Sequence, residues 1–160
     1  MKTLNLQSTV TLCQIDELGA DDQQLVERAI EATRRSYSRY SHFSVGACLR
    51  LADGTEVLGA NQENAVYPVG LCAERTAIFA AQVQHPDVPI VAIAIAARNE
   101  KGELVANPVS PCGSCRQVML EAEQRHNQPM RILLYGTDGV YVMDGVRTLL
   151  PLAFIEDSMK

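Results

Sequence analysis

Two short cysteine motifs in this sequence have residue types and spacing suited to binding a metal ion. Cys72 is followed two positions later by Glu74, and Pro111 is followed by Cys112 and Cys115. Two intervening residues let a pair of cysteine sulfurs converge on one ion, as in many zinc sites. Each motif is expected at a helix N-terminus, where unpaired N–H groups and the helix dipole favour thiolate over thiol. The motifs therefore predict a zinc site with Cys72, Cys112 and Cys115 as ligands.

The predicted ligand set leaves one position of a tetrahedral zinc ion open, as catalytic sites do for water. The histidines His42, His85 and His126 stand at no obvious ligand spacing from the cysteines. A closed structural site, completed by a distant side chain, remains an alternative. A redox pair is disfavoured because it would leave Cys72 and Glu74 without a role.

Glu74 is the candidate acid–base group. In the first turn of a helix beside the metal, its carboxylate can take a proton from water and later deliver one to a leaving amine. Without the neighbouring cysteine motifs, the presence of Glu74 would be explained by the helix dipole, which favours acidic residues in the first turn. Zinc with three thiolates has a net charge of −1 and is a poor Lewis acid unless that charge is offset. Arg75 is the best candidate for hydrogen-bonding the thiolates, and Arg116 is a weaker one.

The elements that must position these residues are read from hydrophobic periodicity and turn residues. A helix is expected from Asp21 or Asp22 towards Tyr40, and helices should begin at Cys72 and after Pro111. Strands are expected over 45–51, 56–60, 90–98, 130–135 and 140–143, and a loop over 61–71. Strands that alternate with helices predict a three-layer α-β-α domain with a central five-stranded sheet. A parallel pair of strands would bring the helix starts at Cys72 and Cys112 to one sheet edge.

Composition narrows the class of protein. The chain has 160 residues and a formal net charge of −5, which disfavours binding to nucleic acid polymers. Its longest apolar run, 89–97, is too short to cross a bilayer, and the N-terminus lacks the pattern of a secretory signal. Five cysteines fit a reducing, cytoplasmic location better than a disulfide framework. We expect residues 21–160 to form a single domain and residues 1–20 to be an extension of unassigned role.

The chain resembles the cytidine deaminases of the small, homotetrameric type with an all-cysteine zinc site. The resemblance runs from about Asp21 onward. It is carried by five motifs in the same order: Tyr40-Ser-His-Phe43 with Val45-Gly-Ala47, Asn61-Gln-Glu-Asn64, Cys72-Ala-Glu-Arg-Thr-Ala77, Pro111-Cys-Gly-Ser-Cys-Arg-Gln117, and Leu149-Leu-Pro151 with Phe154. Arg39 departs from the proline that is usual there, and Ser114 replaces a small apolar residue.

The resemblance implies a mixed sheet, a zinc cofactor and hydrolytic deamination of cytidine and deoxycytidine to uridine and deoxyuridine in pyrimidine salvage. Glu74 would then carry protons to N3 of the ring and to the departing amine. The resemblance further implies that Asn61 and Glu63 hydrogen-bond the ribose hydroxyls. Phe43 would pack against the nucleoside, and the backbone N–H of Ala73 would hold the base carbonyl.

The resemblance also implies a homotetramer in which Phe154, and more weakly Tyr67, reaches a neighbouring subunit's site. Binding to a membrane or to a nucleic acid polymer is not expected. Two alternatives remain open at this point. The substrate could be another aminopyrimidine nucleoside such as blasticidin S, or the chain could be a catalytically silent zinc- or nucleoside-binding module. Retention of Glu74 beside an open metal position opposes the silent module.

Overall fold

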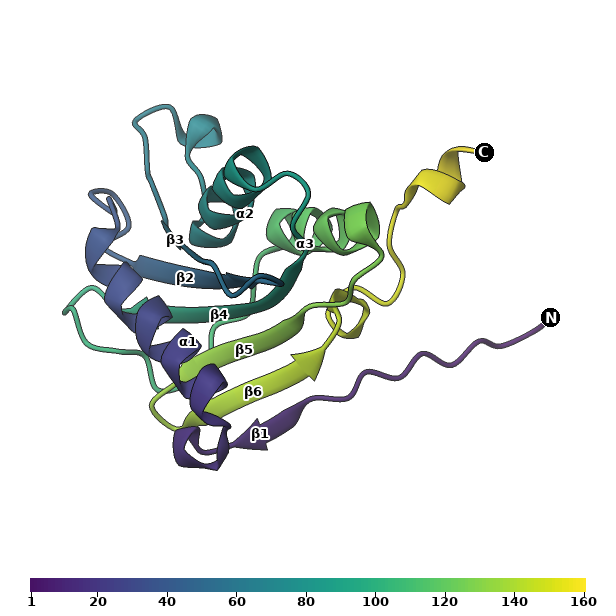
Figure 1. Cartoon of the computed structure of the whole chain (residues 1–160). Coiled ribbons are helices and arrows are strands. Elements are labelled where there is room, and N and C mark those ends of the chain that lie inside the picture. Colours follow the sequence, from purple (N-terminus) through teal and green to yellow (C-terminus); the bar gives the residue numbers. More distant parts are fainter.

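A six-stranded mixed sheet forms the centre of the computed structural model, which describes residues 1–160 (Figure 1). The strand order is β1-β6-β5-β4-β2-β3. Only β4 and β5 pair in parallel; the other neighbours are antiparallel. The strands are β1 (Thr11–Cys13), β2 (Ser44–Leu51), β3 (Glu56–Ala60), β4 (Ile90–Arg98), β5 (Arg131–Gly136) and β6 (Gly139–Asp144).

Helices cover both faces of this sheet, which confirms the three-layer arrangement. Helix α1 (Ala20–Ala32) lies on one face, and α2 (Ala73–Gln84) and α3 (Gly113–His126) lie on the other (Figure 1). Successive residues of β2 point to opposite faces of the sheet. Leu49 packs in the hydrophobic cluster beneath α2 and α3, and Cys48 packs in the cluster beneath α1. No helix is long and apolar enough to span a membrane.

The expectation of five strands was wrong because the segment before Asp21 supplies a sixth. Strand β1 pairs antiparallel with β6, and Cys13 lies opposite Val140. It is only three residues long, and its partner follows 127 positions later. A strand this short is defined by its long-range partner rather than by its own composition. The N-terminal extension therefore contributes the last strand of the sheet.

Helix α1 also ends earlier than expected, at Ala32, with one 3-10 turn after it at Thr33–Arg35. Its N-cap is Gly19 rather than an aspartate. Tyr37 instead lies beside the segment after β3: its N–H donates to Asn61 O at 3.0 Å, and its carbonyl accepts from Glu63 N at 2.8 Å. Because both backbone groups of Tyr37 are used there, the helix cannot continue towards Tyr40.

The connection α2–β4–α3–β5 places the starts of two helices at one sheet edge. Each helix precedes one strand of the parallel β4–β5 pair. Helices α2 and α3 therefore both run back against these strands, and both begin near the strands' carboxyl ends. This edge is where Cys72 and Cys112 cap the two helices.

Gly59 in β3 allows α2 to approach the sheet closely. A Cβ atom at this position would lie 2.3 Å from Ala73 O and 2.6 Å from Ala77 N. Only glycine fits between this strand and the first turn of the helix. Gly59 thereby fixes the position of the first turn of α2, which contains Glu74.

Candidate active site

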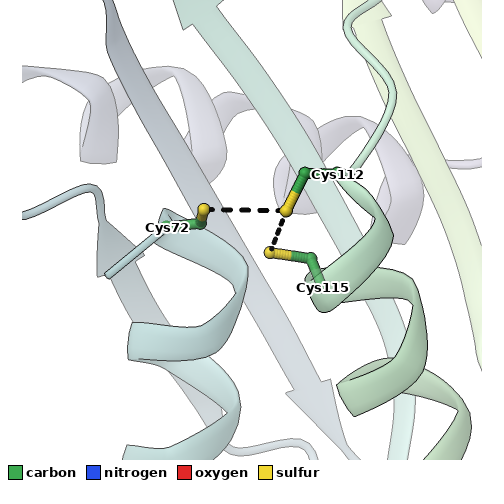
Figure 2. A group of neighbouring side chains, drawn as sticks. All are labelled: Cys72, Cys112 and Cys115. Atoms are coloured by element: carbon green, nitrogen blue, oxygen red, sulfur yellow. Dashed lines mark hydrogen bonds between the residues drawn. The ribbon is translucent and has the colours of Figure 1, made fainter. Parts of the chain in front are cut away.

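Three cysteine sulfurs meet where helices α2 and α3 begin, and their side chains point towards one another (Figure 2). Cys72 Sγ lies 3.9 Å from Cys112 Sγ, and Cys112 Sγ lies 3.4 Å from Cys115 Sγ. All three sulfurs lie within 4.8 Å of one another, and no histidine, aspartate or glutamate joins the group. The structure therefore brings together the three residues that the sequence predicted as ligands.

The donor set fits a zinc ion. Two sulfurs that each bind tetrahedral zinc at about 2.3 Å are separated by roughly 3.8 Å. The observed separations bracket this value closely. A trio of sulfur donors with no fourth side chain is typical of a site that keeps one coordination position open.

Helix starts and one arginine surround the sulfurs with positive potential. Cys72 and Cys112 are the N-cap residues of their helices, so the orphan N–H groups of two first turns lie nearby. Hydrogen bonds from Cys115 and Arg75 lower the pKa of Cys72 to about 5. The hydrogen bond to Cys72, together with burial, raises the pKa of Cys115. The first charge of the cluster therefore resides on Cys72.

Arg75 is placed to offset sulfur charge, as its position next to Glu74 suggested. Its Nη2 atom lies 3.6 Å from Cys72 Sγ. Its Nε atom is buried without a hydrogen-bond partner within the chain. A half-buried cationic group whose Nε–H has no partner is stabilised by negative charge close to it. Arg116, the weaker candidate, lies elsewhere: it donates to Pro111 O at 2.9 Å and to Leu149 O at 2.8 Å.

Glu74 is buried in the first turn of α2 and is only 4% exposed. Burial raises the pKa of its carboxyl group, and the charge on Cys72 raises it further. A carboxyl group with a raised pKa exchanges protons more readily near neutral pH than an exposed one. Glu74 therefore has the protonation chemistry expected of a group that both accepts and returns a proton.

A cavity of about 660 Å³ opens onto this cluster, within the range of small-molecule sites. Its metal end is lined by Cys72, Glu74, Arg75 and Cys112. Cys115 is fully buried and does not line it. Ala73 is also buried, as the first residue of α2, so its N–H is one that the helix leaves without an internal partner.

The same cavity is lined by Phe43, Asn61 and Glu63, the residues that the resemblance assigns to the sugar and to packing. Tyr67, which the resemblance assigns more weakly to a neighbouring subunit's site, lines the cavity of its own chain. Tyr67 packs edge-to-face on Tyr40, with ring centroids 5.8 Å apart. Phe154 does not line the cavity of its own chain, and the residue is 62% exposed. Its carbonyl accepts from Gln117 Nε2 at 2.8 Å, which ties the C-terminal tail to α3.

Asn61 presents one free donor after its internal hydrogen bonds are counted. Its Oδ1 atom accepts from Ser36 Oγ at 2.6 Å and from Val45 N at 2.8 Å. Its Nδ2 atom donates to Phe43 O at 2.9 Å. A side-chain amide has two acceptor sites and two donor hydrogens. One N–H therefore remains, and it can serve a ligand oxygen.

Glu63 presents the complementary acceptor. Its Oε2 atom accepts from Tyr40 N at 2.7 Å and from Ser41 N at 3.2 Å, and its Oε1 atom accepts from Ser41 Oγ. A carboxylate has about four acceptor sites, so one remains. A hydroxyl group both accepts and donates, which suits the remaining donor of Asn61 and the remaining acceptor of Glu63.

Sequence reasoning did not single out several cavity residues. Tyr40 and Ser41 belong to a motif that it noted, but no role was given to them. Leu71, Val109 and Ser110 also line the cavity, and each lies one to three positions before a cysteine ligand. Their position immediately before the two helix starts was the available signal.

Comparison with known proteins places the chain in a family. The family model described as the cytidine and deoxycytidylate deaminase zinc-binding region matches residues 20–128. The chain belongs to the cytidine and deoxycytidylate deaminase family. All three clustered cysteines, and Glu74 beside them, fall within the matched residues.

Individual members of the cytidine deaminase family agree with this assignment. A cytidine deaminase of Halalkalibacterium halodurans is 40% identical over 139 residues, which cover 87% of this chain and 98% of the relative. The crystal structure of cytidine deaminase from Burkholderia pseudomallei is similar with a TM-score of 0.70 and 38% identity, over 82% of this chain and 97% of that one. The cytidine deaminase from Mycobacterium tuberculosis has a TM-score of 0.66 and 31% identity, over 86% and 99% of the two chains.

Proposed function

We propose that the protein hydrolyses the amino group from cytidine and deoxycytidine, releasing ammonia and forming uridine and deoxyuridine for pyrimidine salvage. One observation carries the proposal: the buried Glu74 lies beside a three-sulfur cluster at the end of a cavity of about 660 Å³. Membership of the cytidine deaminase family supports the same reaction.

Zinc is the proposed cofactor, held by Cys72, Cys112 and Cys115. Bound by these sulfurs, the ion would supply one open position for water and lower the pKa of that water towards neutrality. Arg75 and the two helix N-termini offset the charge of the thiolates, which otherwise weakens such a site.

Glu74 moves the protons of the proposed reaction. Its carboxylate accepts a proton from the attacking water and delivers it to N3 of the cytosine ring. It then accepts the remaining proton of the hydroxyl added at C4 and delivers that proton to the departing amine, which leaves as ammonia. Burial suits it to this exchange, because it raises the pKa of the carboxyl group. The reaction needs no other titratable residue at the metal end of the cavity.

The opposite end of the cavity binds the sugar and orients the base. Asn61 donates to a sugar hydroxyl and Glu63 accepts from it, since each has one hydrogen-bonding site left. Phe43 packs against the nucleoside, and Ala73 N–H holds the base carbonyl. This placement directs the amino-bearing carbon of the ring towards Glu74.

We further propose that the enzyme works in the cytoplasm as a homotetramer, with residues 21–160 as its catalytic domain. Phe154, and more weakly Tyr67, would complete a neighbouring subunit's site. The exposure of Phe154 outside its own cavity supports a role in another subunit. Five free cysteines suit a reducing compartment. The negative net charge supports a free nucleoside rather than a polynucleotide as substrate.

The test is ammonia release by the purified, zinc-loaded protein from cytidine and deoxycytidine, with cytosine and deoxycytidylate as controls. Turnover of the two nucleosides, lost on chelation and restored by zinc, is the expected result. A zinc-loaded protein that releases ammonia from none of the four compounds would refute the proposed reaction. Turnover of deoxycytidylate in preference to the nucleosides would refute the proposed substrate.

A further inference from the structure

The loop between the end of α1 and the start of β2 forms one wall of the cavity. His42 adopts a left-handed backbone conformation with φ of 54°, and its N–H donates to Ser38 O at 2.9 Å. A residue other than glycine in this conformation indicates a loop fixed by its surroundings. The turn at His42 directs Ser41 and Phe43 towards the cavity, which both of them line.

The hydroxyl of Ser41 joins two residues of this cavity. It donates to Glu63 Oε1 and accepts from the backbone N–H of Phe43 at 3.0 Å. The backbone N–H groups of Tyr40 and Ser41 fill the other oxygen of the same carboxylate. The hydrogen bond from Ser41, followed by those from the two backbone groups, lowers the pKa of Glu63. Three donors from two adjacent residues thus hold one carboxylate in a single orientation.

We propose that Ser41 is a positioning residue, whose hydroxyl orients Glu63 so that its one remaining acceptor site faces the 2′- or 3′-hydroxyl of the substrate's sugar. The inference rests on the proposed function and adds a residue to which sequence reasoning gave no role. Without the hydroxyl, Glu63 Oε1 has two open sites instead of one, and the carboxylate can rotate or bind water there. Ser41 makes no hydrogen bond to Glu74 or to a cysteine of the cluster, so base recognition and proton transfer should be unaffected.

The proposal distinguishes Ser41 from a serine that merely supports its loop. A structural role would alter the cavity for every substrate. A role exerted through Glu63 alters only those substrates that offer a 2′- or 3′-hydroxyl. The pair cytidine and 2′,3′-dideoxycytidine separates the two cases, because the second compound has the same base and lacks the hydroxyls that Glu63 would bind.

The experiment measures kcat and KM of the zinc-loaded enzyme for both compounds in Ser41→Ala, Ser41→Thr and Glu63→Gln. We expect Ser41→Ala to raise KM for cytidine about tenfold, as the loss of one hydrogen bond to a charged group does, and to leave kcat within about twofold. KM for 2′,3′-dideoxycytidine should change by less than about twofold. Ser41→Thr keeps a hydroxyl and should largely restore KM for cytidine.

Ser38→Ala is the matched control, because Ser38 lies in the same loop but bonds Ser44 Oγ at 2.9 Å and does not line the cavity. Ser38→Ala should leave kcat and KM for both substrates unchanged. In the double variant Ser41→Ala with Glu63→Gln, KM for cytidine should equal that of Glu63→Gln alone, since Ser41 acts through Glu63.

Equal losses on both substrates, or effects of the two changes that multiply, would overturn the proposal. A Ser41→Ala protein that no longer folds would leave Glu63→Gln to decide, and an equal loss on both substrates in that variant would also overturn it. Absence of turnover by the wild-type enzyme would instead refute the proposed function, and this inference would fall with it.

Discussion

Cys72 Sγ and Cys112 Sγ lie 3.9 Å apart, although forty positions of sequence separate the two residues. Each caps a helix, and the strand β4 between those helices lies beside β5, its only parallel neighbour. The metal-binding group therefore depends on the tertiary arrangement of two helix–strand units.

Replacing Cys112 by serine should remove bound zinc, because the remaining two sulfurs cannot hold the ion in competition with a chelator. Zinc per chain, measured by atomic absorption after dialysis against a mild chelator, should fall from about one to near zero. Cys13→Ser is the control, since Cys13 lies in β1 and outside the sulfur cluster. If the Cys112 variant kept its full zinc content, the assignment of the ligands would be wrong.

Glu74→Gln should retain zinc and lose most turnover. The amide has the same shape but cannot accept and return a proton, and the loss of a general acid–base group costs about 10²–10⁴ in rate. Steady-state ammonia release with a parallel zinc assay checks both parts. Glu121→Gln, on the exposed side of α3, should keep full activity. An active Glu74→Gln enzyme would remove Glu74 from the mechanism.

Arg75→Gln should weaken zinc binding by about 10–100-fold, the usual effect of losing a group that supports a metal ligand. Arg75 Nη2 lies 3.6 Å from Cys72 Sγ, and its pKa is raised chiefly by this hydrogen bond. Competition with a chromogenic chelator gives the affinity. Arg34→Gln changes an exposed arginine by the same amount of charge and should have no effect. Equal affinities in the two variants would contradict the role of Arg75.

Gly59→Ala should destabilise the fold by about 2 kcal/mol, because the new methyl group overlaps the backbone of α2. The nearest atoms are Ala73 O at 2.3 Å and Ala77 N at 2.6 Å. Urea denaturation monitored by circular dichroism measures the change in the free energy of unfolding. Gly19→Ala, where a Cβ atom meets nothing within 4 Å, creates no overlap and should cost less than about 1 kcal/mol, since only a glycine N-cap of α1 is lost. Two equally stable variants would show that β3 and α2 can separate freely.

Mixing two inactive variants tests whether a site takes residues from more than one subunit. Phe154→Ala and Glu74→Gln each damage a different part of a shared site. If Phe154 acts in a neighbouring site, subunit exchange creates some sites in which both residues are intact, and activity should reappear. Each variant incubated alone through the same exchange step is the control. No recovery, with mixed oligomers detected by native mass spectrometry, would place Phe154 in its own site or outside any.

Much of the site could be predicted from the sequence because its chemistry is local. The N-cap positions of Cys72 and Cys112, and the first-turn position of Glu74, follow from short motifs at helix starts. Strand β4 was predicted with its observed bounds, since Ile90–Arg98 is a β-branched apolar run buried on both faces.

The remaining features depend on contacts between distant segments. Strand β1 exists because β6 is beside it, and Tyr37 leaves the helical path because Asn61 and Glu63 bind its backbone. The orientation of Arg116 towards Pro111 and Leu149 was likewise not contained in its neighbours along the chain. Nor could the sequence reveal that Ser41 bonds a carboxylate 22 positions away.

With zinc as the proposed ion, the helix starts that bring Cys72 and Cys112 together would also link metal supply to the lifetime of the protein. An ion held by both residues closes a loop of forty positions and binds only the folded chain, so it acts as a reversible cross-link. Each tenfold rise in free zinc above the dissociation constant would then add about 1.4 kcal/mol to the free energy of unfolding. A cell short of zinc would thus lose enzyme molecules to proteolysis as well as activity.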